Sequence, residues 1–243
     1  MIVLGGLGPG SVHFVGLITI FLIETVHLLL IEALINRSIF ELLNHNVYTK
    51  YIGRSLHSNN NNLYGIMVWV AYLNGKNINF LWTKNGDTLV FNRGWCKNVF
   101  YKSTNLDLII IPGITCALAK LGVNNLCISN KIKGGILFIS NADSLDAFIK
   151  NYVSVLYMSK LKFYVILDNL ICLGLMSNKS IMLTTNIGLS SQSLLIVNLK
   201  DILFYNPNRW INSPTLITIS NMIHKYVSTN WFKPIFNEIH DIN

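Results

Sequence analysis

Short runs of apolar residues recur along the chain, separated by segments long enough to form helices. In the first half these runs span residues 2–4, 27–31, 47–52, 78–81 and 108–111. Continuous rather than alternating apolar runs are typical of strands that are buried on both faces, as in a parallel sheet covered by helices. The pattern therefore predicts an α/β fold whose first domain has a mainly parallel sheet.

The intervening segments and the second half complete this prediction. Helices are expected near residues 38–43, 62–73, 115–121 and 161–173, and further strands near residues 136–140, 153–158, 181–184, 194–199 and 216–219. Pro112-Gly113 interrupts the chain between the two halves. We therefore expect two α/β domains, residues 1–113 with the parallel sheet and residues 114–243 with a mixed sheet.

One stretch, residues 84–94, combines glycine with charges of both signs directly after an apolar run. Gly86 permits a close backbone approach or a positive φ, and Asp87 and Arg93 carry opposite charges. Ligands of parallel sheets bind at the carboxyl ends of strands. A ligand site is one interpretation of this stretch, and an ordinary surface turn is the other, because Asn-Gly-Asp is also common turn chemistry.

Two other glycine turns also follow apolar runs. Gly8 lies in the turn after the first run, and Gly113 follows the run at residues 108–111. The first turn contains Pro9 and does not continue as a dinucleotide-binding Gly-x-Gly-x-x-Gly motif. We expect Gly8, Gly86 and Gly113 to converge on one edge of the sheet.

Composition narrows the class of protein. Of 243 residues, 51% are hydrophobic and 12% are charged, which excludes a disordered chain. The most apolar span, residues 16–35, contains Glu24, His27 and Glu32, which are costly at a bilayer centre. The N-terminus lacks the basic segment and cleavage site of a secretory signal. We expect a cytoplasmic protein without stable membrane insertion.

The formal charge of +8 indicates an anionic partner. The basic residues are spread along the chain without interleaved aromatic clusters, which favours a small polyanion over nucleic acid. The cysteines form no Cys-x-x-Cys pair and the histidines no ligand spacing, so neither a metal site nor a disulfide framework is indicated.

Five segments, in chain order, resemble the tetrapyrrole methylase family. Residues 3–10 are similar to its first glycine motif, and residues 85–94 resemble its Gly-Gly-Asp-Pro-Phe-Ile-Phe-Gly-Arg-Gly signature, the most specific match. The other matches are residues 111–115, Tyr157-Met158, and Ser213-Pro214 with Trp231-Phe232. The resemblance covers nearly the whole chain.

The resemblance implies an S-adenosyl-L-methionine-dependent methyltransferase that converts uroporphyrinogen III to precorrin-2, for sirohaem or cobalamin. It also implies a homodimer in which the cofactor lies between the two domains. The cofactor-binding residues carried over from it are Gly8, Pro9, Gly10, Asn85, Gly86, Asp87, Val90, Thr115, Cys116, Met158 and Gly188.

Catalytic roles follow from the same resemblance at three positions. Glu32 stands where the family has an aspartate proton acceptor, and Arg54 stands where it has a lysine proton donor. Because a guanidinium hardly gives up a proton near neutral pH, we expect Arg54 to act electrostatically, holding either a substrate carboxylate or the charge of Glu32. Glu32 is then expected to act alone as the base. Arg93, whose planar fork suits a carboxylate, is expected to hold a propionate or acetate of the substrate.

Departures from the family pattern leave other functions open. Thr88 replaces a proline of the signature, Trp95 and Cys96 replace carboxylates after it, and Asn130 lies in a segment where the family has Thr-His-Arg. One alternative is a methyltransferase of the cobalamin pathway that acts on a later precorrin. The other is a cofactor-binding or membrane-associated protein without catalysis.

Overall fold

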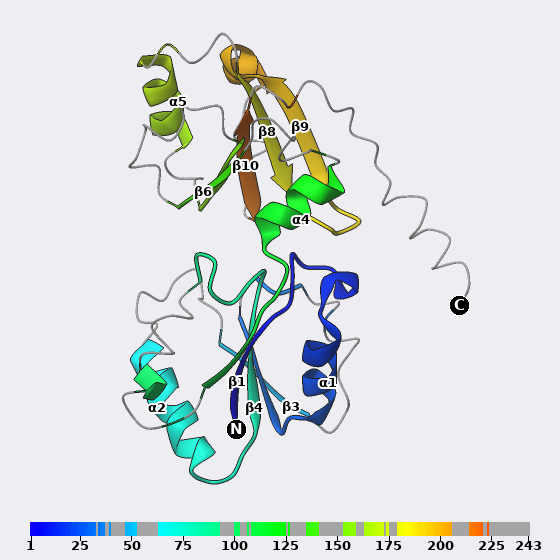
Figure 1. Ribbon diagram of the computed structural model, residues 1–243, viewed down its shortest axis with the longest axis vertical. Coiled ribbons are helices and arrows are strands. Elements are labelled where there is room, and N and C mark those ends of the chain that lie inside the picture. The colour runs from blue at the N-terminus through cyan, green and yellow to red at the C-terminus, as the bar shows by residue number, and fades with distance from the viewer. Residues whose placement is uncertain are drawn as a thin grey trace, which may run out of the picture. The chain divides into compact units, whose positions relative to one another are not determined.

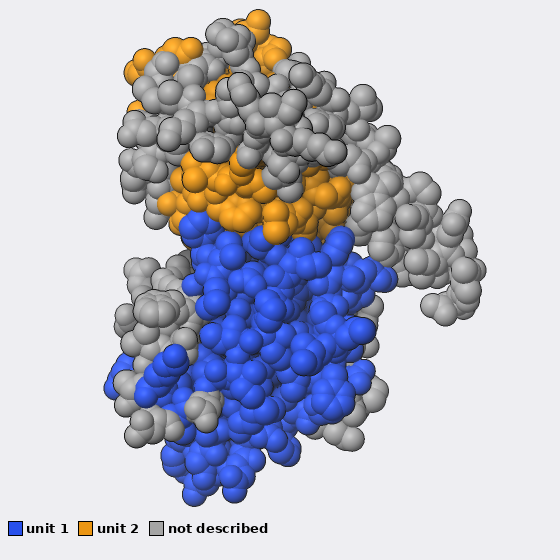
Figure 2. Space-filling view, in the orientation of Figure 1, with its two compact units in different colours: residues 1–116 blue, residues 117–243 orange. Residues whose placement is uncertain are grey.

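The computed structural model shows two compact units, Met1–Cys116 and Ala117–Asn243 (Figures 1 and 2). It describes residues 1–32, 34–36, 39, 47–52, 63–92, 100–102, 106, 108–124, 126, 135–140, 153–158, 163–172, 174, 179–205, 214–220 and 223. Each unit is built around one sheet. The sequence predicted a domain boundary after Gly113, and the two compact units divide after Cys116. The domain boundary itself remains a prediction.

Unit 1 contains a five-stranded sheet in which every neighbouring pair is parallel. Its strands are β1 (Ile2–Gly6), β2 (Leu28–Ile31), β3 (Tyr48–Tyr51), β4 (Phe80–Lys84) and β5 (Leu108–Ile111), in the spatial order β3-β2-β4-β1-β5. The predicted parallel sheet is confirmed. All five predicted apolar runs of the first half form its strands.

Helices cover both faces of this sheet (Figure 1). The 3-10 helix η1 (Val12–Phe14) precedes α1 (Leu17–Thr25), and α2 (Leu63–Asn74) precedes β4. On one face Ile23 of α1 packs with Val3 and Leu81, and on the other Val70 of α2 packs with Leu4 and Phe80. Alternate residues of each strand thus enter different cores, which explains the continuous apolar runs.

Unit 2 contains a five-stranded mixed sheet. Its elements are α4 (Cys116–Val123), β6 (Ile136–Ser140), β7 (Val153–Tyr157), α5 (Phe163–Cys172), β8 (Ser180–Thr185), β9 (Ser193–Asn198), η4 (Leu199–Tyr205) and β10 (Thr215–Ser220), with the strand order β6-β7-β10-β8-β9. Only β6 and β7 pair in parallel among these neighbours. The predicted mixed sheet is confirmed.

The cores of unit 2 show why these segments fold as predicted. In α5 the residues Phe163, Ile166, Leu167 and Leu170 are all buried, at the spacing that places them on one helix face. They pack on Ile181 and Ile217 of the central strands. The helix is followed by Gly174, whose φ of +66° is the usual conformation after a helix end.

Two expectations need comment. Strand β4 continues to Lys84, so the stretch that begins at this residue starts as a buried strand rather than as loop. The predicted helix near residues 38–43 lies almost wholly outside the described residues. In the part of the chain that the structure describes, no helix is long and apolar enough to cross a membrane.

Candidate functional site

The first glycine turn and the Asn-Gly-Asp loop are joined at the carboxyl ends of β1 and β4. Leu7 N donates to Lys84 O at 2.8 Å, and Gly8 and Gly86 exchange two backbone hydrogen bonds of 3.2 and 2.6 Å. Both glycines have positive φ, +72° and +73°. The two segments that were predicted to converge on this edge of the sheet therefore do so.

The third glycine turn approaches the same place through its backbone. A Cβ atom added to Gly6 would lie 2.6 Å from Gly113 N, and one added to Gly113 would lie 2.8 Å from Gly6 Cα. Neither position has room for a side chain. The ends of β1, β4 and β5 thus form a close-packed backbone surface, as expected for Gly8, Gly86 and Gly113.

Asp87 organises this loop with its carboxylate. Its Oδ1 accepts hydrogen bonds from Leu89 N at 2.8 Å and Val90 N at 3.1 Å, and its Oδ2 accepts from Gly113 N at 3.1 Å. A carboxylate that accepts from several backbone N–H groups is a strong, geometrically specific acceptor. Asp87 therefore shapes the loop after β4 and ties it to the segment after β5.

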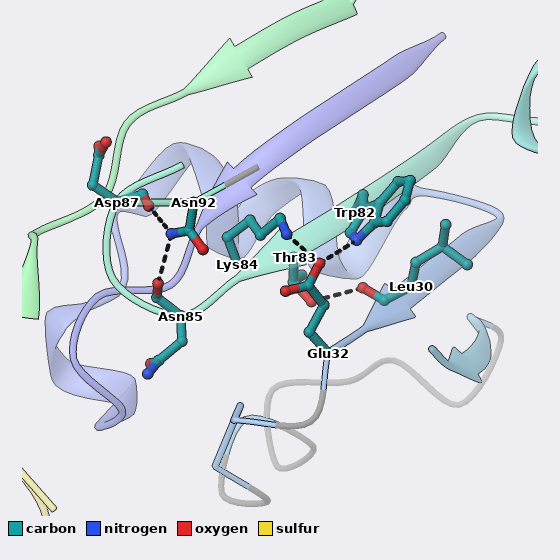
Figure 3. A network of polar contacts seen from close by, with 8 residues as sticks. All are labelled: Leu30, Glu32, Trp82, Thr83, Lys84, Asn85, Asp87 and Asn92. Carbon is teal, nitrogen blue, oxygen red and sulfur yellow. Dashed lines mark hydrogen bonds and ion pairs between the residues drawn. The ribbon is translucent and has the colours of Figure 1, made fainter. Parts of the chain in front are cut away.

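Asn92 closes the loop from its other end (Figure 3). Its Nδ2 donates to Asn85 O at 3.2 Å and also to Asp87 O. The loop from Asn85 to Asn92 is thus a defined structure with its own side-chain contacts, and it is more than a simple surface turn. Arg93 and Gly94, which continue the motif, lie outside the described residues.

A polar cluster lies beside this loop at the end of β2 (Figure 3). Lys84 Nζ pairs with Glu32 Oε1, and Trp82 Nε1 donates to the same oxygen at 3.0 Å. Lys84 is 4% exposed and Glu32 is 28% exposed. The structure therefore places Glu32 at the predicted strand end, with a buried lysine as its partner.

Thr115 and Cys116 follow β5 and lie against the same loop. A Cβ atom on Gly86 would lie 3.1 Å from Cys116 Sγ. Burial raises the pKa of the Cys116 thiol to about 11. The raised pKa favours the uncharged thiol, and the side chain packs against the glycine loop.

The predicted residues of unit 2 are described within that unit. Met158 follows β7 with a φ of +53° and is 62% exposed, which is an unusual backbone conformation for this residue type. Gly188 lies in the turn between β8 and β9, has a φ of +76°, and donates its N–H to Gln192 Oε1 at 2.8 Å. Both positions are strand-end turns.

The remaining predicted positions fall into two groups. Pro9 is buried in the first turn, and Gly10 there has a φ of +139°. Arg54, Arg93, Trp95, Cys96 and Asn130 lie outside the described residues. Among the residues that are described, no group of three or more His, Cys, Asp or Glu side chains is arranged to hold a metal ion.

Sequence reasoning missed the roles of Lys84 and Trp82. Lys84 was treated as the start of a loop, and Trp82 lay between that loop and the apolar run at residues 78–81 without an assigned role. Both face the carboxylate that follows β2 because β2 and β4 are neighbours in the sheet. The spacing of Trp82 and Lys84, two residues apart at a strand end, was the only available signal.

Comparison with known proteins gives distant matches. No protein-family model matches this sequence. The chain is similar to siroheme synthase of Baumannia cicadellinicola subsp. Homalodisca coagulata, with 23% identity over 98% of this chain and 53% of that protein. It is also similar to the chloroplastic S-adenosyl-L-methionine-dependent uroporphyrinogen III methyltransferase of Arabidopsis thaliana, with 27% identity over 49% of this chain and 33% of that protein. The chain spans about half of the first relative's length and a third of the second's.

Solved structures agree well with this chain in fold, although their sequence identities are low. Cobalt precorrin-4 methyltransferase, a cobalamin biosynthetic enzyme, has a TM-score of 0.79 at 12% identity and covers 91% of this chain and 95% of its own. Uroporphyrin-III C-methyltransferase from Thermus thermophilus, complexed with S-adenosylhomocysteine, has a TM-score of 0.75 at 17% identity and covers 93% and 99%. The chain has the fold of these methyltransferases, and its resemblance to the tetrapyrrole methylase family is confirmed.

Proposed function

We propose that this chain is an S-adenosyl-L-methionine-dependent methyltransferase that methylates uroporphyrinogen III at two carbons and forms precorrin-2. The observation that carries the proposal is the Asn85–Asn92 loop, held by Asp87 and joined to the Gly8 turn, at the strand ends of this fold. A site of closely packed backbone and fixed polar groups suits a reaction whose main demand is orientation.

The residues of the glycine turns fit the cofactor. Gly86, with its positive φ, lets the loop pack closely against Cys116, and Asp87 fixes the backbone that follows it. The residues proposed to hold the cofactor are Gly8, Pro9, Gly10, Asn85, Gly86, Asp87, Val90, Thr115, Cys116, Met158 and Gly188. When bound, the cofactor supplies a sulfonium methyl group to a nucleophilic carbon.

Glu32 is the proposed proton acceptor. A proton must leave the tetrapyrrole after methyl transfer, and a positioned carboxylate at a strand end serves this purpose. Its partial exposure, 28%, leaves it accessible to a ligand. Arg93 is proposed to hold a carboxylate of the substrate by two parallel hydrogen bonds. Arg54 is proposed to act electrostatically, on a substrate carboxylate or on the charge of Glu32.

The charge of the chain supports the substrate class. Uroporphyrinogen III carries eight carboxylates, and the chain has a formal charge of +8 with a pI of about 9.3. Long-range attraction of this kind raises the rate of encounter with a polyanion. We further propose that the protein is a cytoplasmic homodimer and that precorrin-2 enters the synthesis of sirohaem or cobalamin.

One incubation tests the proposal. The purified protein is mixed with methyl-labelled S-adenosylmethionine and uroporphyrinogen III under reducing, oxygen-free conditions, and the products are resolved by mass spectrometry. A doubly labelled tetrapyrrole is expected. A parallel incubation supplies a more methylated precorrin, and transfer only to that compound would identify the later cobalamin-pathway enzyme instead. Calorimetric binding of S-adenosylmethionine without transfer to either tetrapyrrole would identify a non-catalytic protein.

A further inference from the structure

Two side chains of β4 reach the same carboxylate oxygen at the end of β2. Trp82 and Lys84 are two residues apart on the strand, so they point to the same face of the sheet. The register pairs Leu30 of β2 with Trp82, and this alignment places Glu32 level with Lys84. Pleat and register together bring both donors to Glu32 Oε1 (Figure 3).

The two donors are more deeply buried than the carboxylate. Lys84 is 4% exposed and Trp82 is 2% exposed, whereas Glu32 is 28% exposed. The ammonium also lies 5.7 Å from the centroid of the Trp82 ring, so the two donors contact each other. The carboxylate is thus bound by buried donors on one side and remains partly exposed at the strand ends.

This arrangement differs from an ordinary surface ion pair. Exposed pairs contribute little because both side chains move freely and water competes for them. Water competes much less for the ammonium of a buried lysine such as Lys84, and an indole N–H can only donate. Two buried donors on one oxygen therefore restrict the position and rotation of the Glu32 side chain.

We propose that Lys84 and Trp82 are positioning residues that hold Glu32 in the orientation needed to accept the proton. This inference rests on the proposed function, in which Glu32 is the base. The pair acts through Glu32 and takes no part in methyl transfer itself. The longer side chain of glutamate needs such a restraint more than an aspartate would, because it has one more rotatable bond.

Kinetics of variants separate positioning from binding. Lys84→Met is expected to lower kcat about tenfold while the KM for S-adenosylmethionine stays within about twofold, because only the base is displaced. Lys84→Arg is expected to restore most of the lost kcat, since it keeps a cationic donor. Trp82→Phe is expected to lower kcat by about threefold, because Lys84 still donates to Glu32. Lys76→Met and Trp69→Phe are the matched controls away from Glu32.

Nuclear magnetic resonance of the indole N–H groups gives a second measurement that does not depend on activity. The signal that disappears in Trp82→Phe identifies Trp82. This signal is expected to move in both Glu32→Gln and Lys84→Met, because each change alters the acceptor or the charge beside the indole. It is expected to stay in place in Lys76→Met.

The outcomes separate the two proposals. If the wild-type protein transfers methyl groups and Lys84→Met keeps full kcat while Glu32→Gln loses it, the positioning role is wrong and the proposed function stands. If the wild-type protein transfers no methyl groups, the proposed function is wrong. The indole signal then shows by itself whether Lys84 and Trp82 hold the Glu32 side chain. If the Trp82 indole signal does not move in Glu32→Gln, the positioning of Glu32 by Trp82 and Lys84 is wrong in either case.

Discussion

Lys84 of unit 1 and Lys120 of unit 2 are both buried, but their ammonium groups have different kinds of partner. Lys84 lies at the carboxyl end of β4 and pairs with the carboxylate of Glu32. Lys120 of α4 is fully buried, and its Nζ donates to two backbone carbonyls, Met182 O at 3.0 Å and Leu216 O at 2.8 Å. In the described part of the chain no carboxylate pairs with Lys120.

The difference lies in the partners available at the two places, a carboxylate at the strand ends of unit 1 and backbone carbonyls beneath α4. At the strand ends of unit 1 a lysine keeps a charged partner that is itself open to a ligand. Under α4, burial lowers the pKa of Lys120 well below its ordinary value, because carbonyl groups do not replace the hydration of an ammonium. This contrast agrees with the proposal that Lys84 positions Glu32, whereas the contacts of Lys120 lie within the packing of unit 2.

Glu32→Gln is the most severe test of this contrast. The amide keeps an acceptor oxygen for Trp82 and Lys84 but removes the negative charge, so Lys84 acquires surroundings like those of Lys120. Methylation is expected to fall at least tenfold, in line with the usual contribution of a general base. Initial rates of labelled methyl transfer measure it, with the thermal unfolding midpoint as the control for folding. Full activity across pH 6 to 9 would remove Glu32 from the mechanism.

Asp87→Ala tests whether the loop beside Lys84 depends on one side chain. The change leaves three backbone N–H groups without their acceptor, and the free energy of unfolding is expected to fall by about 2 kcal/mol. Urea unfolding followed by circular dichroism measures it. Asp87→Asn keeps an acceptor oxygen and should lose less. Equal losses in the two variants would mean that the hydrogen bonds do not stabilise the loop.

Lys120→Met tests the interior half of the contrast. Because burial lowers the Lys120 pKa, the folded protein binds fewer protons there than the unfolded chain at pH values below 10.5, the ordinary lysine pKa. The stability of the wild type should therefore fall as pH falls from 10.5. Methionine removes this dependence and should raise the free energy of unfolding at pH 7 by about 1 kcal/mol.

Denaturant unfolding at pH 7, 8 and 9 measures both effects of Lys120→Met. Lys76→Met, at an exposed lysine, is the matched control and should leave the pH dependence unchanged. A destabilised Lys120→Met protein with the pH dependence of the wild type would show that Lys120 stays charged. The contrast with Lys84 would then fail.

Lys50→Gln provides the exposed reference, with the smallest expected effect. Lys50 lies on β3 with its Nζ 4.1 Å from the centroid of the Trp69 ring. Loss of this cation–π contact at an exposed site should cost about 0.5 kcal/mol, and Lys50→Arg should cost less. Urea unfolding measures both. If Lys50→Gln lost more free energy of unfolding than Asp87→Ala, the size of the loss would not follow the burial of the substituted side chain.

Much of the candidate site followed from local sequence. Glycine turns after apolar runs predicted where Gly8, Gly86 and Gly113 would meet, because parallel strands end at the same edge of their sheet. The Asn-Gly-Asp motif marked the loop, but it did not reveal that the Asp87 carboxylate binds backbone N–H groups, one of them at Gly113. Such a contact joins residues far apart in the sequence.

The sequence by itself determined the strands, the helices α2, α4 and α5 and the type of each sheet, since these depend on the spacing of apolar side chains along short segments. Strand order was decided only by the tertiary structure. The neighbouring positions of β2 and β4 bring Lys84 and Trp82 to Glu32, and the packing of α4 buries Lys120 against two carbonyls. Partners of buried charges are non-local, because the groups that replace water around them come from whichever segments the fold places nearby.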